Sequence, residues 1–176
     1  LDGKDVALAL DSKLQYLAFS HLKRAVAQHR AKAGGVVVLD VRTGEILALV
    51  NLPTYNPNNR YKLAGAQLRN RALTDSFEPG STLKPFTAAL AIEKGKVRFN
   101  TQIQTSPGKL VIGSATITDS TKHGALTVAQ VIQKSSNVGI AKIAMSMTPG
   151  EMWSMFDSMG FGATLNLNFP GEVSGR

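Results

Sequence analysis

The sequence predicts an α+β fold in which a small antiparallel sheet is covered by helices and followed by a mainly helical part. Three observations lead to this prediction. An apolar helical pattern runs over residues 13–32. Two apolar β-type runs, residues 35–40 and 45–50, then flank a short turn that contains Gly44, which predicts a β-hairpin. The remaining chain carries helical patterns separated by short extended pieces.

The first helix has clear start and stop signals. Ser12 and Gln15 have the spacing of a capping box, with Ser12 as the N-cap. A basic last turn at Lys32 and the glycines 34–35 predict its C-terminal end. Before the helix, the apolar residues 6–10 are expected to form a short strand.

The two runs of the hairpin are apolar on both faces, as in strands that lie inside a sheet covered by helices. A two-stranded hairpin of this kind is not stable by itself, and partner strands are not evident in the later sequence. We therefore expect the chain to be only the N-terminal part of a larger domain. Apolar side chains near residues 35–50 should then be exposed when the chain is considered alone.

The later part of the sequence predicts four helices, at 82–94, 127–134, 137–147 and 149–159. Thr127 and Pro149 fit helix starts, the first as a cap and the second in the first turn. We expect short extended pieces near 101–105, 109–112 and 115–118 and no regular period over 165–176. The domain organisation expected from this pattern is a sheet-side part, 1–51, and a mainly helical part, 52–176.

Composition excludes several classes of protein. The chain has 176 residues, a formal net charge of +8 and no cysteine, so neither a disulfide framework nor thiolate zinc is expected. Three scattered histidines leave little for a metal site, and no metal or organic cofactor is expected. The basic excess lies mainly in residues 60–98 and is not interleaved with aromatic residues, which argues against nucleic-acid binding.

No segment is long and apolar enough to span a bilayer, since the best candidate, residues 138–145, is interrupted by Lys142. The N-terminus lacks the pattern of a signal peptide, and the chain opens at Leu1 without an initiator methionine. We interpret it as a piece of a longer protein whose anchor lies elsewhere.

Serine followed three residues later by lysine occurs three times, at Ser20, Ser81 and Ser106. Ser20 lies within the first helix and Ser106 precedes a Pro-Gly turn, so neither needs a catalytic explanation. Ser81 is different, because it follows a Glu-Pro-Gly turn and opens an apolar helix whose start is fixed by Pro85.

This placement suits a nucleophile. Ser81 lies at the positive end of the helix dipole, and Lys84 lies one turn later on the same face. A lysine whose pKa is lowered can activate a serine hydroxyl, and backbone N–H groups at the helix start can hold an oxyanion. The alternative is an ordinary N-cap serine with a solvated lysine.

A second cluster, Lys134-Ser135-Ser136-Asn137, falls between two predicted helices. Ser135 could relay a proton and the Asn137 amide could orient a peptide. Helix capping by one of these three residues is the competing interpretation, because serine and asparagine are preferred caps.

Together, Glu78–Phe86 and Lys134–Gly139 resemble the first two motifs of the penicillin-binding proteins. The resemblance is strongest to the class B, division-type D,D-transpeptidases. Four further stretches are similar to that group: residues 41–48, 55–59, 69–72 and 169–172. The resemblance implies the fold shared by penicillin-binding transpeptidases and serine β-lactamases.

The resemblance also implies residue roles. Ser81 would be the acylated nucleophile, and its backbone N–H would contribute to the oxyanion hole. Lys84 would activate it, and Ser135 would pass protons between Lys84 and the leaving group. Asn137, with Ser136, would bind the substrate. The reaction implied is cross-linking of peptidoglycan stem peptides in septal cell-wall synthesis, with β-lactam antibiotics as inhibitors.

The resemblance further implies a periplasmic protein, attached to the inner membrane by a segment outside this chain. Divisome proteins, including a glycosyltransferase, would be its partners.

One departure from the family pattern stands out. The third motif, Lys-Ser/Thr-Gly, does not occur after Asn137, and the near match 42–44 lies in the hairpin turn, in the wrong order. The piece would therefore carry half of a site.

Three alternatives stay open on the sequence. A serine β-lactamase would need a deacylating glutamate, for which Glu172 has a plausible position but the wrong neighbours. A non-catalytic β-lactam sensor of the same fold and a basic helical binding module are the others.

Overall fold

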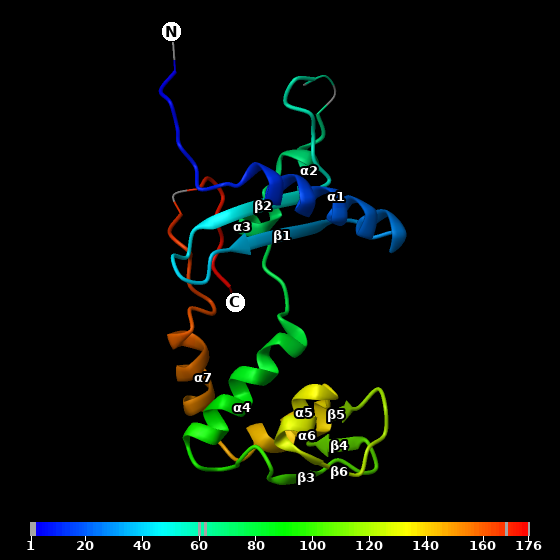
Figure 1. Cartoon of the computed structure of the whole chain (residues 1–176). Coiled ribbons are helices and arrows are strands. Elements are labelled where there is room, and N and C mark those ends of the chain that lie inside the picture. The colour runs from blue at the N-terminus through cyan, green and yellow to red at the C-terminus, as the bar shows by residue number, and fades with distance from the viewer. Residues whose placement is uncertain (1–2, 60, 62, 168, 176) are drawn as a thin grey trace. The chain divides into compact units, whose positions relative to one another are not determined.

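A computed structural model describes residues 3–59, 61, 63–167 and 169–175 (Figure 1). The chain divides into two compact units, one of residues 1–76 with 165–174 and one of residues 77–164 with 175–176. The division therefore differs from the expected boundary at residue 51. The late segment also joins the first unit, where the N–H of Val173 donates to the carbonyl of Leu73 at 3.1 Å.

In the first unit, helix α1 (Ser12–Gln28) packs on the antiparallel pair β1 (Gly34–Leu39) and β2 (Ile46–Leu52), which confirms the predicted helix and hairpin. A Cβ atom on Gly34 would lie only 2.9 Å from Leu22 Cδ1 and 3.2 Å from Val26 Cγ2. Gly34 therefore allows strand and helix to approach closely, and it is not the stop signal of the helix.

The start of α1 corrects the predicted capping box. Asp11, not Ser12, is the N-cap, and its carboxylate accepts from the backbone N–H groups of Lys13 and Leu14. Gln15 does not reach back to the cap. Its side chain instead donates to the carbonyl and accepts from the N–H of Leu49, at 2.9 and 2.8 Å, on the outer edge of β2.

The end of α1 was predicted four residues too late. Arg30 has φ +49°, and the N–H groups of Arg30 and Ala31 donate back to Ala27 and Val26, which is a Schellman ending without glycine. The predicted strand at residues 6–10 is also wrong, because this segment is exposed and has no strand partner among the described residues.

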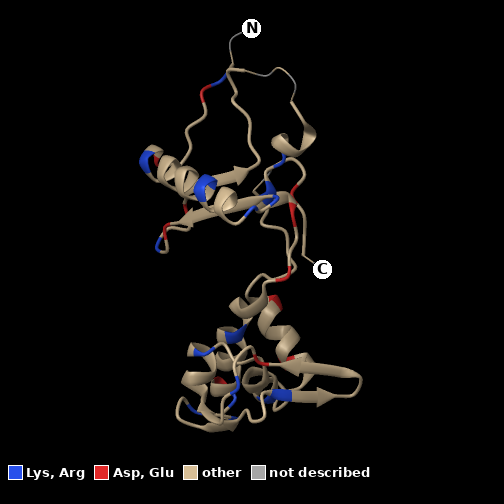
Figure 2. Cartoon of the chain, turned by 90° about the vertical axis from the view of Figure 1, so that its right-hand side faces the viewer, with Lys and Arg blue, Asp and Glu red and all other residues tan. Residues whose placement is uncertain are grey.

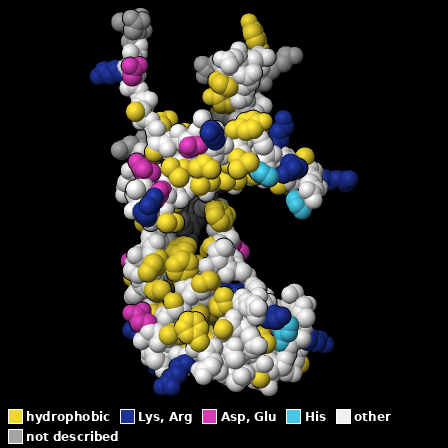
Figure 3. Space-filling view, viewed as in Figure 1, with side chains coloured by type: hydrophobic (Ala, Val, Ile, Leu, Met, Phe, Trp, Pro, Cys, Tyr) yellow, Lys and Arg dark blue, Asp and Glu magenta, His cyan; other side chains and the backbone are white. Residues whose placement is uncertain are grey.

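Short helices α2 (Gly65–Leu68) and α3 (Arg71–Thr74) complete the first unit. The Asn51 side chain joins β2 to α3, because it accepts from the N–H of Ala72 at 3.0 Å and donates to Asn70. Val37 and Leu39 of β1 are 46 % and 53 % exposed, as expected for apolar side chains of this hairpin. Hydrophobic side chains show on the visible surface of both units in Figure 3.

The second unit contains the predicted helices. They are the 3₁₀ turn η1 (Gly80–Leu83) that leads into α4 (Lys84–Glu93), then α5 (Val128–Gln133), α6 (Asn137–Ala144) and α7 (Pro149–Ser158). Thr127 caps α5, and Pro149 stands in the first turn of α7, both as predicted. Their core consists of apolar side chains from α4, α5, α6, β6 and the connections after α4 and α6: Ala88, Leu90, Ala91, Val97, Leu126, Val128, Val131, Ile143 and Met147.

Two small antiparallel pairs accompany these helices. The pair β4 (Lys109–Ile112) and β5 (Ala115–Thr118) matches two predicted extended pieces. The third piece, β3 (Gln102–Gln104), pairs with β6 (Ala125–Thr127), a strand that we did not anticipate. The described residues of the tail, 165–167 and 169–175, form neither helix nor strand, as expected.

Lys and Arg residues are distributed over helices and loops of both units (Figure 2). Within the described part of the chain, no helix has the length and apolar character needed to cross a membrane.

Candidate active site

Ser81 and Lys84 lie within one turn, at the junction of η1 and α4 in the second unit. Gly80, with φ +58°, lets the chain leave the Glu-Pro-Gly turn, and Pro85 stands in the first turn of α4, where no N–H is needed. Ser81 is exposed, whereas Lys84 is only 8 % exposed. The hydroxyl is thus open to a ligand while the amine is held inside the unit.

Ser135 and Asn137 come from the connection between α5 and α6. The sharp turn places Ser135 at φ +53°, in the left-handed region that residues other than glycine rarely adopt. Asn137 is the first residue of α6 and is exposed. This turn directs both side chains toward Lys84, whose chain position is about fifty residues earlier.

Hydrogen bonds connect these residues into one chain. Lys84 Nζ lies 2.8 Å from Ser135 Oγ, 2.6 Å from the Ser135 carbonyl and 2.7 Å from Asn137 Oδ1. Ser135 Oγ lies 3.0 Å from Ser81 Oγ. The structure therefore brings together Ser81, Lys84, Ser135 and Asn137, and the link from Ser81 to Lys84 runs through the Ser135 hydroxyl.

Burial makes the neutral form of Lys84 easier to reach than it is for an exposed lysine. Burial lowers the pKa of the Lys84 amine, and the negative charge of Asp119 acts in the opposite direction. Two of the three groups around Nζ, the Ser135 carbonyl and Asn137 Oδ1, can only accept hydrogen bonds. A neutral amine would donate to both and direct its lone pair at the Ser135 hydroxyl, which is the one neighbour able to give it a proton.

Ser136 has a different role from the one expected. Its side chain is 2 % exposed, and its hydroxyl donates to Asp119 Oδ2 at 2.7 Å and accepts from the N–H of Gly139 at 2.9 Å. It is the N-cap of α6. We therefore do not retain Ser136 as a substrate-binding residue.

The Asn137 side chain is held at both ends. Its Nδ2 donates to the Thr118 carbonyl at 2.9 Å, and its Oδ1 accepts from Lys84. An amide has a second N–H and a second lone pair, so Asn137 retains the capacity to bind a peptide.

Asp119 is the residue that sequence reasoning missed. It follows β5, and its carboxylate accepts from the start of α6. A single aspartate 16 positions before the Ser135 cluster gives no recognisable spacing, because the contact depends on how the β4–β5 pair packs against α6.

The other sequence candidates take no part in the hydrogen bonds that join Ser81, Lys84, Ser135 and Asn137. Ser20 is inside α1, and Ser106 lies in the turn between β3 and β4. Residues 42–44 form the turn between β1 and β2. Glu172 belongs to the first unit, where its Oε2 accepts from the N–H of Leu167. None of them forms part of the cluster at Ser81.

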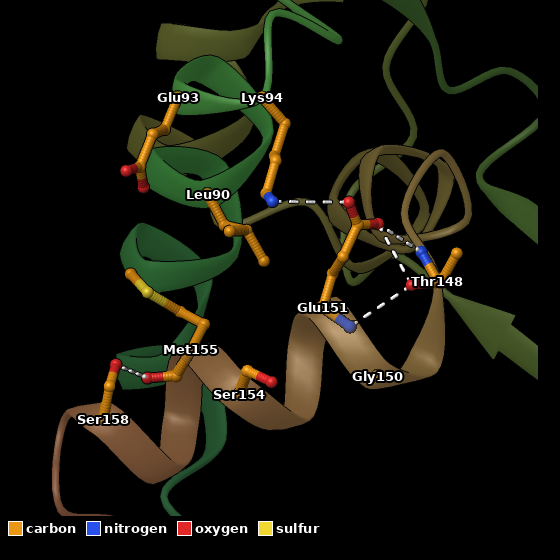
Figure 4. A pocket seen from close by; sticks show the side chains of 9 residues that line it. All are labelled: Leu90, Glu93, Lys94, Thr148, Gly150, Glu151, Ser154, Met155 and Ser158. Atoms are coloured by element: carbon orange, nitrogen blue, oxygen red, sulfur yellow. Dashed lines mark hydrogen bonds and ion pairs between the residues drawn. The ribbon is translucent and has the colours of Figure 1, made fainter.

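Two cavities open on the second unit. One of about 330 Å³ adjoins Ser81, Lys84 and Asn137 and has an apolar wall formed by Leu83, Ile140, Ala141 and Ala144. A larger one, of about 520 Å³, lies between α4 and α7 (Figure 4). There Glu151 Oε2 accepts from the N–H and the hydroxyl of Thr148, which is the capping box of α7, and Glu151 pairs with Lys94 at 3.6 Å. The smaller cavity is the one that adjoins the predicted catalytic residues.

A serine hydroxyl connected to a buried lysine, with a Ser-x-Asn turn beside it, is typical of the serine acyl-transfer enzymes that carry a Ser-x-x-Lys motif. The profile of one family, described as the penicillin binding protein transpeptidase domain, matches residues 34–176. The chain belongs to this family, and its resemblance to the class B members is confirmed.

Curated relatives match almost the whole chain. It is 48 % identical to the probable peptidoglycan D,D-transpeptidase PenA of Neisseria flavescens, over 99 % of this chain and 43 % of the relative. It is 42 % identical to the peptidoglycan D,D-transpeptidase FtsI of Escherichia coli K12, over 97 % of this chain and 29 % of the relative. The chain thus spans less than half the length of either protein.

Solved structures confirm the expected fold. A peptidoglycan glycosyltransferase from Burkholderia ambifaria matches with a TM-score of 0.85 and 51 % identity, over 97 % of this chain and 50 % of that one. The transpeptidase domain of penicillin-binding protein 3 from Burkholderia pseudomallei matches with a TM-score of 0.85 and 47 % identity, over 99 % and 48 %. The chain therefore has the penicillin-binding transpeptidase fold and covers part of the domain.

Proposed function

We propose that the protein is a peptidoglycan D,D-transpeptidase that works through an acyl-enzyme on Ser81. The observation that carries this proposal is the continuous path from the exposed Ser81 hydroxyl through Ser135 to the buried Lys84 amine. The names of the curated relatives, PenA and FtsI, agree with it.

In the acylation step, Ser81 Oγ attacks the carbonyl carbon of the D-Ala–D-Ala bond of a stem peptide. The proton of Ser81 passes to Ser135 Oγ as the proton of Ser135 passes to the neutral Lys84 amine. The oxyanion that forms is held by backbone N–H groups at the start of the helix, including that of Ser81, which have no intrahelical partner. Asn137 orients the peptide through the free capacity of its amide.

The tetrahedral intermediate then collapses. The C–N bond breaks, the leaving D-Ala amine takes a proton from Lys84 through Ser135, and an ester remains on Ser81. The amine of a second stem peptide attacks this ester and loses its proton to Lys84 along the same path. The C–O bond breaks, Ser81 regains its proton, and a cross-link has formed.

A β-lactam would acylate Ser81 by the same first step, with the opened ring held as a stable ester. The resemblance to class B proteins extends the proposal to septal cell-wall synthesis in the periplasm. The protein would be attached to the inner membrane by a segment outside this chain, and its partners would be divisome proteins including a glycosyltransferase. The third motif of the family would come from sequence outside this chain.

Labelling of the full-length protein with benzylpenicillin tests the proposal. The penicillin mass should be found on Ser81, and Ser81→Ala should abolish the adduct. Ser106→Ala, which alters another Ser-x-x-Lys pair, is the matched control and should label like the wild type. An adduct on another serine would refute the assignment of the nucleophile. Rapid hydrolysis of the penicillin without a lasting adduct would instead indicate a β-lactamase, and labelling that Ser81→Ala leaves unchanged would indicate a basic binding module. A β-lactam sensor would also be labelled on Ser81, so a signalling segment joined to this domain in the full-length protein is what would identify it.

A further inference from the structure

The carboxylate of Asp119 accepts three hydrogen bonds from the start of α6. Its Oδ2 accepts from the Ser136 hydroxyl at 2.7 Å, and its Oδ1 accepts from the N–H groups of Asn137 and Val138 at 2.5 and 3.0 Å. Its own N–H donates to the Gly108 carbonyl at 3.0 Å, which fixes the backbone after β5. Hydrogen bonds to an ionised carboxylate are stronger than those between neutral groups.

The turn that Asp119 holds is the one that carries the catalytic candidates. Lys84 binds the carbonyl and hydroxyl of Ser135 and the amide of Asn137, so residues 135–137 are bound by the Lys84 amine on one side and by the Asp119 carboxylate on the other. Ser135 has φ +53°, and such a conformation persists only where the surrounding structure enforces it.

We propose that Asp119 is a positioning residue of the active site, which holds residues 135–137 in the left-handed turn that brings Ser135 between Ser81 and Lys84. This inference rests on the proposed function. The Asp119 side chain forms its hydrogen bonds with residues 136–138 and none with the Ser81 hydroxyl or the Lys84 amine, so it acts through the turn and through its charge.

The charge gives Asp119 a second, measurable effect. The groups around Lys84 are uncharged: Ser81 from η1, Thr87 from α4, and Ser135 and Asn137 from the α5–α6 connection. Among the described residues, Asp119 is the charged group that raises the pKa of Lys84, against the lowering caused by burial. Loss of this charge should let Lys84 become neutral at lower pH.

Asp119→Asn removes the charge, keeps the size of the side chain and replaces charge-assisted hydrogen bonds of the turn by weaker neutral ones. An amide oxygen in place of Oδ1 can still accept from Asn137 and Val138, and Nδ2 in place of Oδ2 can donate to the Ser136 hydroxyl. The rate of penicillin acylation in the full-length protein should rise with pH along a limb set by the neutral fraction of Lys84. In Asp119→Asn this limb should move to lower pH.

The same variant should lower the plateau of the acylation rate, by up to about 100-fold, because a displaced catalytic group costs that much. Ser136→Ala removes one hydrogen bond to Asp119 but keeps its charge, so it should lower the plateau and leave the limb in place. Asp157→Asn, which removes an exposed carboxylate on α7, is the matched control and should change neither.

A lower plateau with an unmoved limb in Asp119→Asn would overturn the role of the charge, and a wild-type profile would overturn the proposal entirely. If this variant does not fold, Asp119→Glu replaces it. Asp119→Glu keeps the charge, so a shift of its pH-dependent limb of the acylation rate would contradict the proposal. A wild-type plateau rate in both Asp119→Glu and Ser136→Ala would contradict it as well.

Failure of the proposed function is a separate outcome, seen as a wild-type protein that penicillin does not label. In that case an NMR titration of the Lys84 methylene signal still tests Asp119. The titration of the wild type should lie at higher pH than that of Asp119→Asn, and coincident curves would refute the inference.

Discussion

Gly139 is the point where α6 crosses α5, and Gly139→Ala tests how tightly the catalytic turn is packed. A Cβ atom there would lie 2.6 and 2.9 Å from the two methyl groups of Val131 and 3.0 Å from Ser136 Oγ. Val131 is completely buried, so it has no free space into which to move. The added methyl group must push α6 away from α5 or displace the cap of α6.

Two effects of opposite sign set the magnitude. Helix propensity alone favours alanine over glycine by about 1 kcal/mol. Relief of the contact with Val131 requires a separation of about 1 Å, since carbon atoms prefer about 3.5–4.0 Å, and overpacking of this kind costs about 1–3 kcal/mol. Because 2.6 Å is a severe overlap, we expect the steric cost to exceed the gain. The free energy of unfolding should fall by about 1–2 kcal/mol.

Urea unfolding monitored by circular dichroism measures this change, and a double-mutant cycle assigns it to the contact. Val131→Ala alone should cost about 2 kcal/mol through lost burial and a cavity. In the double variant the new methyl group fills part of that cavity. The two changes together should therefore cost at least about 1 kcal/mol less than the sum of the single effects.

Gly150→Ala is the matched control, because Gly150 is also helical but a Cβ atom there meets nothing within 4 Å (Figure 4). It should be neutral or stabilising by up to about 1 kcal/mol. A Gly139→Ala variant as stable as the wild type, or a double variant with strictly additive effects, would refute the packing argument.

Two further predictions concern the base and the first helix. Lys84→Ala should slow penicillin acylation of Ser81 by about 10²–10⁴-fold, because the base is lost. In the wild type the acylation rate should fall as the pH drops below the lowered pKa of Lys84, because the ammonium cannot take a proton. A rate independent of Lys84 would contradict its role as base. Gln15→Ala should lower the free energy of unfolding by about 1–3 kcal/mol, because the N–H and carbonyl of Leu49 both lose a partner; a loss within experimental error would show that water replaces the amide.

Local sequence signals predicted most of the elements. Proline and threonine at helix starts, continuous apolar runs and the glycine-containing turn are all short-range features, and the structure has the corresponding helices and the hairpin. Ser81 and Lys84 were found for the same reason, since the Glu-Pro-Gly turn and Pro85 fix the start of α4 within a few residues.

The errors arise where a distant partner decides the outcome. Gln15 has the spacing of a capping residue, but the free edge of β2 at Leu49 offers its amide two hydrogen bonds. The end of α1 is a local exception, because Arg30 adopts a conformation that sequence patterns assign to glycine. Asp119 became important only because β5 packs beside α6, a contact between segments with no shared sequence period.

The two edges of the hairpin differ in how their backbone groups are hydrogen-bonded, and this difference has a practical consequence. Asp11 and Gln15 cap the outer edge of β2 by binding backbone groups of Leu47 and Leu49, whereas no described residue caps the corresponding edge of β1 in this way. The same strand carries the half-exposed side chains of Val37 and Leu39 on one of its faces. An open, apolar strand edge is a template for pairing with another chain. Concentrated solutions of the isolated chain should therefore self-associate through β1, and a lysine at position 37 would be the simplest way to keep it monomeric.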